Sequence, residues 1–292
     1  MEKAKVYFSK EISPEKVLEM YKKLGINLPG KLAVKVHSGE EGNQNFLRPE
    51  FWKPVIDELH GTVVECNTAY PGKRNTTKKH TKLMEKHGWS KVFDVDIMDS
   101  EGDVDLDIEG GKHLKKNRVG KHMMNYDSLL VLSHFKGHPM GGYGGALKQL
   151  SIGCASSAGK CWIHSGGRTH RQGLVWLMTA PQEVFLECMA ESASTVVKHF
   201  EGKCAFINVM CNMSVDCDCC SVAEDPCMKD IGILASTDPI AIDQACLDLV
   251  YKSDDPGRDH LLERIESRKG VHTIEAADML GYGTREYDLI EI

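Results

Sequence analysis

The stretch Ser128-Leu-Leu-Val-Leu-Ser133, followed by His134-Phe-Lys-Gly-His-Pro-Met-Gly-Gly-Tyr-Gly-Gly-Ala-Leu-Lys148, indicates the fold class of this chain. Its first six residues are a short apolar run, typical of a strand that is buried on both faces of a parallel sheet. The loop that follows is rich in glycine and histidine, and ligands gather at such carboxyl ends of strands in open α/β sheets. The pattern therefore predicts an α/β protein whose ligand loops lie at the carboxyl ends of its strands.

The sequence on both sides of this run alternates between helical and strand patterns. Ser13-Pro14 is a typical helix start, and Asp238-Pro239 is another. Further strands are expected at 32–36, 62–66, 205–209 and 231–235, and further helices at 49–59, 77–87, 182–199 and 254–269. Such alternation favours a mostly parallel sheet covered by helices.

Composition narrows the class of protein. The 292 residues are 41% hydrophobic and 27% charged, which is typical of a globular chain. With 36 basic and 42 acidic residues there is no basic excess, so nucleic acid is not an expected partner. The charged N-terminus and the absence of a long apolar run predict a cytoplasmic protein without a membrane segment. We expect a single α/β domain over 1–292, and if it has two lobes, they should meet near 159–179.

Eleven cysteines are unusual for a chain without an export signal. Their odd number and the size of the chain make metal binding a better explanation than a disulfide framework. Five of them fall within one short segment: Cys211, Cys217, Cys219, Cys220 and Cys227. Thiolates select zinc, copper(I) or iron–sulfur clusters, but the spacing matches neither zinc ribbons nor ferredoxins. The segment therefore predicts a metal site without identifying the metal, and the alternative is a buried thiol-rich turn.

The glycine-rich loop is the second candidate site. Its glycines leave the backbone free for close approach by a ligand: Gly141, Gly142, Gly144 and Gly145. His134, His138 and Lys148 flank these glycines and are expected to act on one small anionic molecule by acid–base chemistry. Lys136 and Arg74 are expected at the same edge of the sheet and would bind the same anion. The alternative is a glycine-rich turn with histidines on the surface.

Several long motifs resemble one protein family. They are Val34-Lys-Val-His-Ser-Gly-Glu40, Asn45-Phe-Leu-Arg-Pro-Glu50, Ser133-His-Phe-Lys-Gly-His138, Gly141 to Ser156, Asp216-Cys-Asp-Cys219 and Asp230 to Asp243. The family is domain-of-unknown-function family 362, usually labelled uncharacterised iron–sulfur-centre proteins, and the resemblance covers nearly the whole chain. Many members carry an inserted ferredoxin-like module after the segment matching His164-Ser165, and this chain lacks it. The iron–sulfur cluster that the family's label implies therefore cannot be inferred for this chain from that module.

The loop is also distantly similar to the N-terminal domain of nickel-pincer lactate racemases, in which H-x-x-x-G-[FY]-S-G-G-x-K carries catalysis and cofactor attachment. The stretch from His138 to Lys148 keeps the same interval between histidine and lysine, with Gly144 in place of the serine. This similarity implies that His138 is an acid–base residue and that Lys148 attaches the cofactor. It also implies that His164 is a metal ligand and that nickel is a candidate metal.

These observations lead to three hypotheses for function. The first is a cytoplasmic metalloprotein, an enzyme or redox protein that binds a small anion together with an iron–sulfur cluster or zinc. The second is a racemase-like or isomerase-like enzyme that acts on a small 2-hydroxy acid. The third is a non-catalytic module that delivers or stores metal. A redox protein would also need a partner protein with which it exchanges electrons.

Overall fold

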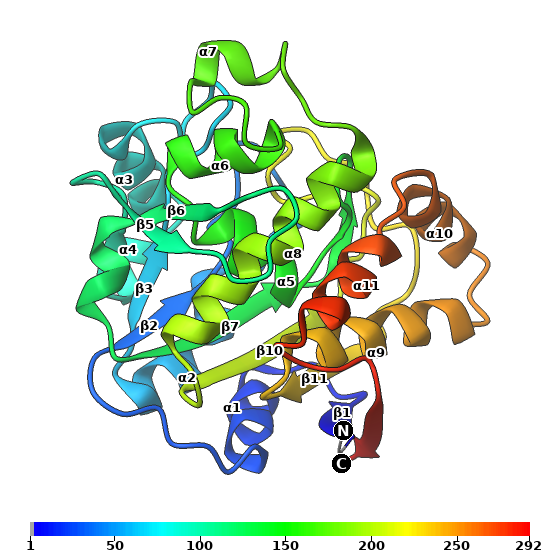
Figure 1. Ribbon diagram of the computed structural model, residues 1–292. Helices are drawn as coiled ribbons and strands as arrows, with labels where there is room; N and C mark the ends of the chain where they lie inside the picture. The colour runs from blue at the N-terminus through cyan, green and yellow to red at the C-terminus, as the bar shows by residue number, and fades with distance from the viewer. Residues whose placement is uncertain (1–2) are drawn as a thin grey trace.

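The computed structural model, which describes residues 3–292, is built around an eight-stranded sheet with helices on both faces (Figure 1). Its strands, in spatial order, are β12 (Tyr287–Glu291), β1 (Ala4–Ser9), β11 (Gly232–Ser236), β10 (Cys204–Met210), β7 (Ser128–His134), β2 (Leu32–Lys35), β3 (Thr62–Glu65) and β4 (Val95–Ile97). Only β11 runs antiparallel to its neighbours in this sheet. The prediction of an α/β fold with a mostly parallel sheet is confirmed.

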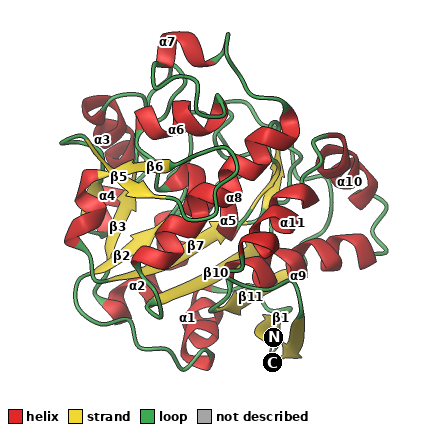
Figure 2. Cartoon of the chain, in the orientation of Figure 1, coloured by secondary structure: helices red, strands yellow, loops and turns green. Residues whose placement is uncertain are grey.

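Two layers of helices cover the sheet (Figure 2). Helices α1 (Pro14–Lys23) and α2 (Pro49–Leu59) pack against one face. Helices α8 (Gln182–His199) and α9 (Pro239–Lys252) lie on the other face, and α11 (Val271–Leu280) packs against α8 and α9. The remaining α-helices are α3 (Thr77–Lys86), α4 (Trp89–Val92), α5 (Ala146–Lys148), α6 (Ser157–His164), α7 (Gln172–Val175) and α10 (Arg258–Ser267).

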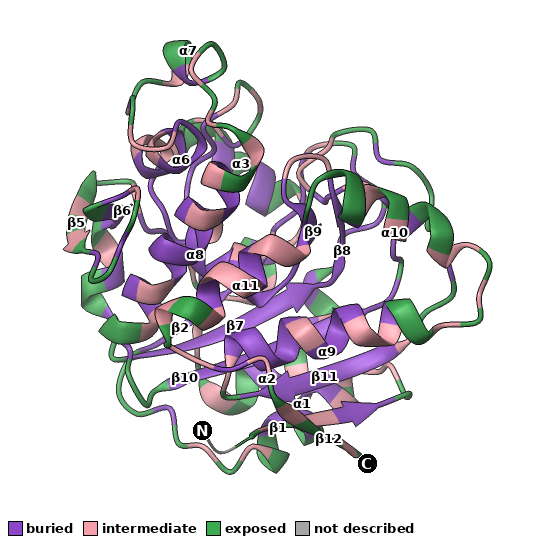
Figure 3. Ribbon diagram, turned by 45° about the vertical axis from the view of Figure 1, so that its right-hand side comes forward, coloured by how far each residue is buried: buried purple, intermediate pink, exposed green. Residues whose placement is uncertain are grey.

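Strand β7 is buried along its whole length, as its apolar run predicts (Figure 3). Leu129 and Val131 belong to the hydrophobic cluster on the α8 side, and Leu130 and Leu132 to the cluster on the α1 side. Successive side chains of a strand point to opposite faces, so a strand covered on both sides needs apolar residues at every position. Each fully buried side chain of this size stabilises the fold by ~1.5–3 kcal/mol.

The predicted helix starts are confirmed by their capping contacts. The Ser13 side chain accepts a hydrogen bond from the Lys16 amide, 3.2 Å away, at the start of α1. Asp238 accepts hydrogen bonds from the Ile240 and Ala241 amides at the start of α9. Such caps satisfy amides that have no partner in the first helical turn, and a cap contributes ~1 kcal/mol.

The glycine-rich segment differs from the predicted loop, because it forms a β-hairpin. Strand β8 (Lys136–His138) pairs antiparallel with β9 (Gly142–Gly144), and both strands are buried. Gly142 has φ of +79°, and a Cβ atom there would lie 2.7 Å from the Gly270 backbone. Glycine is therefore needed at this turn for the left-handed backbone and for close packing against Gly270. A second hairpin consists of β5 (Asp103–Asp107) and β6 (Lys116–Gly120).

Candidate functional site

A cavity of about 230 Å³ lies at the carboxyl ends of β2, β3 and β7. Its wall is unusually rich in basic side chains: Lys35, Arg74, Lys136, Lys148 and Lys160, together with His37, His134, His138 and His164. Glu65 is the one carboxylate on this wall. Because opposite charges attract strongly where water is excluded, this wall suits a small anionic ligand.

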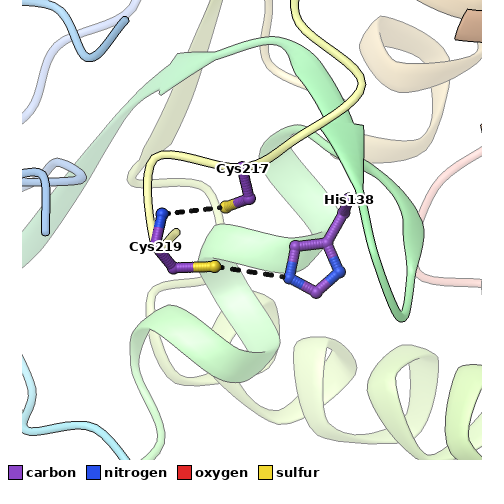
Figure 4. A group of neighbouring side chains, drawn as sticks. All are labelled: His138, Cys217 and Cys219. Atoms are coloured by element: carbon purple, nitrogen blue, oxygen red, sulfur yellow. Dashed lines mark hydrogen bonds between the residues drawn. The ribbon is translucent and has the colours of Figure 1, made fainter. Parts of the chain in front are cut away.

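Two cysteines and a histidine converge beside this cavity (Figure 4). One ligand atom from each of His138, Cys217 and Cys219 lies within 4.8 Å of the other two. Cys219 Sγ is 3.8 Å from His138 Nε2, and the Cys219 amide lies 3.5 Å from Cys217 Sγ. His138 and Cys219 line the cavity, whereas Cys217 is fully buried behind them. The group therefore has two side chains that a ligand in the cavity can approach.

The pKa values of the two thiols shift in opposite directions. Burial alone would raise the pKa of Cys217, but a hydrogen bond from Cys219 and the charges of Lys148 and Lys136 bring it well below the usual range. Lys148 Nζ donates to Cys217 Sγ over 3.2 Å. Hydrogen bonds with Cys217 and Cys220, and burial, raise the pKa of Cys219 well above the usual range. Cys217 is therefore the thiolate of the pair and Cys219 the thiol.

The surroundings of His138 determine which ring nitrogen carries its proton. Burial and the nearby Lys148 charge lower the pKa of His138 to about 4, so the ring is neutral at physiological pH. Nδ1 accepts hydrogen bonds from the Met140 and Gly141 amides, at 3.1 and 2.8 Å. The single ring proton is consequently on Nε2, which faces Cys219. A metal ion at Nε2 would shift the ring proton to Nδ1, so the Met140 and Gly141 amides would have to release that nitrogen.

A buried ion cluster anchors the cysteine-bearing loop. Asp218 contacts Lys136 Nζ at 2.6 Å and His134 Nδ1 at 3.0 Å. Burial would raise the pKa of Asp218, but the positive charges of His134 and Lys136 hold it well below the usual range. His134 Nε2 also bonds to the Cys211 carbonyl oxygen over 2.6 Å. Since both ring nitrogens of His134 already have acceptors, His134 positions Asp218 in this structure and has no free nitrogen for acid–base chemistry.

The structure does not bring all five predicted cysteines together. Cys211 packs in the hydrophobic cluster on the α1 side, and burial raises its pKa to about 12. Cys227 donates to the Met213 carbonyl over 3.2 Å, and burial raises its pKa too. Cys220 follows Cys219 and lines a separate surface groove, which Cys219 also reaches. Within residues 3–292, only Cys217 and Cys219 of the five lie in the compact group with His138.

The remaining predicted site residues divide between the cavity and its surroundings. Arg74 lies on the wall, 3.3 Å from Glu40, and donates to the Tyr70 hydroxyl over 2.7 Å. His164 is also on the wall, stacked on Phe185, but outside the group of Cys217, Cys219 and His138. Gly144 and Gly145 line the cavity, whereas Gly141 and Gly142 lie at the turn of the hairpin.

The amides of the glycine-rich segment are less available to a ligand than its composition suggests. Asp243 is fully buried and accepts hydrogen bonds from the Ala146 and Leu147 amides, at 2.8 and 3.0 Å. The Gly141 amide bonds to His138. The chain's own side chains therefore take several of the backbone donors, and the basic side chains remain as the groups that can bind an anion.

Sequence reasoning did not assign Lys35, Glu65 or Lys160 to the site. Lys35 Nζ contacts Glu65 over 2.7 Å and the Gln149 side chain over 2.9 Å, all of them buried. A lysine at the end of the otherwise apolar strand Leu32–Lys35 was the signal for this contact, because a buried lysine needs an acceptor. Lys160 lies in a helical segment whose sequence carries no such signal.

Comparisons with known proteins identify a family. The model of a domain of unknown function (DUF362) matches residues 32–248. None of the curated proteins matches the chain. Among solved structures, the chain is similar to the lactate racemase apoprotein from Thermoanaerobacterium thermosaccharolyticum, with 13% identity, a TM-score of 0.42, and coverage of 70% of this chain and 50% of that one. It is also similar to a protein from Thermotoga maritima, with 9% identity, a TM-score of 0.43, and coverage of 91% and 59%. The chain thus spans half to three fifths of the length of these two structures.

Among residues 3–292, no helix combines the length and the apolar character that crossing a bilayer requires.

Proposed function

This chain belongs to the DUF362 family, and we propose that it is an enzyme that acts on a small anionic molecule and binds a metal ion through His138, Cys217 and Cys219. The observation that carries this proposal is the convergence of three ligand atoms within 4.8 Å beside a cavity lined by basic side chains. A protein that only delivers metal needs no such cavity, so an enzyme explains more of the structure.

The spacing of the three residues fits a single thiophilic ion. A thiolate sulfur and an imidazole nitrogen bound to one tetrahedral zinc ion lie about 3.6 Å apart, given bond lengths of ~2.3 and ~2.1 Å. Cys219 Sγ and His138 Nε2 are 3.8 Å apart. A [4Fe–4S] cluster takes four thiolates, whereas this group contains two cysteines. We therefore propose one ion of the zinc type.

Three protein ligands suit catalysis better than a purely structural role, because a closed structural zinc site has four. When bound, such an ion keeps one position for a water or a substrate atom and polarises it. The side chains of Lys136 and Lys148 both lie beside Gly144 on the cavity wall and would attract the anionic substrate. Lys148 also stabilises the Cys217 thiolate by its hydrogen bond.

Cobalt(II) titration under anaerobic conditions tests the proposal, since thiolate ligation of cobalt gives a charge-transfer absorption band. We expect one equivalent per chain with this band. The double variant Cys217→Ser/Cys219→Ser should lose it, and the control Cys211→Ser/Cys227→Ser should keep it, because the control cysteines lie elsewhere. Equal cobalt binding by both double variants would exclude this metal site.

A thiol–disulfide redox centre is the second candidate, and the contacts of the metal-free group favour it. Lys148 lies against the Cys217 thiolate, and the Nε2 proton of His138 faces Cys219. In this reaction the Cys217 thiolate and the Cys219 thiol would form a disulfide and pass two electrons and one proton to an external disulfide, which takes its second proton from solvent and becomes two thiols. Mass spectrometry of metal-free protein equilibrated with oxidised glutathione would detect the Cys217–Cys219 disulfide. This candidate function implies a redox partner protein.

The racemase-like alternative stays a prediction. It is supported by the position of His138, Lys148 and His164 on the wall of one cavity. Burial lowers the pKa of His164 to about 3, and its Nδ1 has no hydrogen-bond partner among the described residues. Two neutral imidazoles on one cavity are suited to proton exchange with a bound acid. Exchange of the α-hydrogen of a 2-hydroxy acid with deuterium from solvent would test it.

A further inference from the structure

We propose that Lys160 binds a carboxylate group of the molecule that enters the cavity, so that the substrates of this protein are small carboxylic acids. This inference deepens the proposed function, and it rests on that function for the step from bound ligand to substrate. Five lysine and arginine side chains line the cavity. Among the described residues, four of them contact an anionic group of the protein, and Lys160 does not.

The other four lysines and arginines on the wall are each paired. The pairs are Lys35 with Glu65 at 2.7 Å, Arg74 with Glu40 at 3.3 Å, Lys136 with Asp218 at 2.6 Å, and Lys148 with the Cys217 sulfur at 3.2 Å. In each pair the protein itself supplies the negative charge, so a ligand is not needed to balance these cations.

Lys160 lies on α6 and is only 6% exposed. Its Nζ donates to one acceptor, the Ala155 carbonyl oxygen, at 2.6 Å. An ammonium group has three donor hydrogens, so two remain for a ligand. Within residues 3–292, Lys160 forms no salt bridge. A buried charge without a partner is costly, and a ligand carboxylate would supply both the missing charge and the missing acceptors.

The position of Lys160 places this carboxylate in the same cavity as the cysteine group. After burial, the charges of Lys148 and Lys160 contribute to lowering the pKa of His164. Lys148 and Lys160 are therefore both within electrostatic range of one imidazole on the cavity wall. His164 and Cys219 line the same cavity as Lys160.

A carboxylate suits this site better than a phosphate group. Lys160 carries one positive charge without a salt-bridge partner among the described residues, which matches the single negative charge of a carboxylate. A phosphate monoester carries about −1.5 to −2 at neutral pH and would leave negative charge unbalanced in a buried site. The cavity, at about 230 Å³, has room for a molecule that displaces several waters of ~30 Å³ each.

Isothermal titration of the whole chain with acetate, malonate and succinate, and with inorganic phosphate, tests the inference. At least one carboxylate should bind, and Lys160→Met should weaken it by about tenfold or more, because a hydrogen bond to a charged group contributes ~1.5–3 kcal/mol. Lys160→Arg should restore part of the affinity. The control Lys112→Met removes an exposed lysine that bonds to Glu187 and should change nothing. Lys160→Met should melt no lower than the wild type, since it removes a buried unpaired charge.

Three results would overturn the inference: no binding of any of these acids, equal affinity in Lys160→Met, or tighter Lys160-dependent binding of phosphate. A failure of the metal proposal can be distinguished from a failure of the carboxylate proposal. If Cys217→Ser/Cys219→Ser loses no metal but Lys160→Met loses carboxylate binding, the carboxylate site stands and the metal site does not.

Discussion

The central cysteines, Cys217 and Cys219, differ from the end cysteines, Cys211 and Cys227, although all four belong to one short segment. The Cys217 sulfur contacts Lys148 and lies near Lys136, which bring its pKa well below the usual range. The end cysteines meet apolar side chains or a backbone carbonyl, and burial raises their pKa values. The difference shows that the charges around a thiol decide its chemistry, and that the density of cysteines in the sequence does not.

The charges that distinguish the central cysteines come from another part of the chain. Lys136 belongs to β8 and Lys148 to α5, so both lie on the hairpin region that follows β7. Asp218, between the central cysteines, bonds to Lys136 and so ties the loop to this hairpin. The end cysteines take no part in this contact between the loop and the hairpin.

Replacing Asp218 by Asn should cost about 3–5 kcal/mol of unfolding free energy, because His134 and Lys136 then lose their buried partner. The folded pKa of Asp218 is below its unfolded value near ~3.9. Its stabilising contribution is therefore complete above that unfolded value and is lost as the pH falls towards the folded pKa. Urea denaturation at several pH values measures both effects. The control Asp216→Asn, whose half-buried pair is with Arg264, should cost much less.

Saturation with zinc at about 100 times its dissociation constant should raise the unfolding free energy by ~2.7 kcal/mol, provided that the ion binds only the folded chain. Removal of the ion with a chelator should reverse the gain. The variant Cys217→Ser/Cys219→Ser should show no such gain, because its central ligands are gone. An equal gain in that variant would place the metal away from the central cysteines.

Lys148→Met should raise the pKa of Cys217 in metal-free protein by about one unit or more, which corresponds to ~1.4 kcal/mol. The sign is upward because the lysine charge favours the thiolate over the thiol. Ultraviolet titration of the thiolate in wild type and variant measures the shift. Lys148→Arg keeps a positive charge and should retain most of the low pKa. An unchanged titration curve in Lys148→Met would mean that another donor controls Cys217.

Cys227→Ser should have the smallest effect, below about 1 kcal/mol, since a serine hydroxyl can also donate to the Met213 carbonyl. Metal content should stay at the wild-type level. Thermal unfolding and metal analysis of the purified variant check both statements. Loss of metal would show that an end cysteine takes part in the central site.

Local patterns in the sequence predicted most of the fold. The strands β2, β3, β7 and β10 and the helices α2 and α8 lie where apolar periodicity indicates, and α1 and α9 begin at their predicted capping residues. The hairpin of β8 and β9 was expected as a loop, because glycines give little strand signal and its pairing depends on burial against neighbouring segments. Strands β1 and β12 were not predicted; β12 is an edge strand that pairs only with β1, from the opposite end of the chain, and β1 lies between β12 and β11.

Sequence alone determined the α/β class, the edge of the sheet that carries the site, and His138, Lys148, Cys217 and Cys219 as candidate residues. Tertiary structure decided which of these meet. His138 and Cys219 are separated by 81 positions, and their approach depends on how β8 packs beside the loop after β10. Folding also places Cys211 and Cys227 away from the group of His138, Cys217 and Cys219, and it gives Lys160 no anionic partner among the described residues. The physical reason is that periodicity reports local burial, whereas the charge and pKa of a buried side chain depend on groups that only folding brings near.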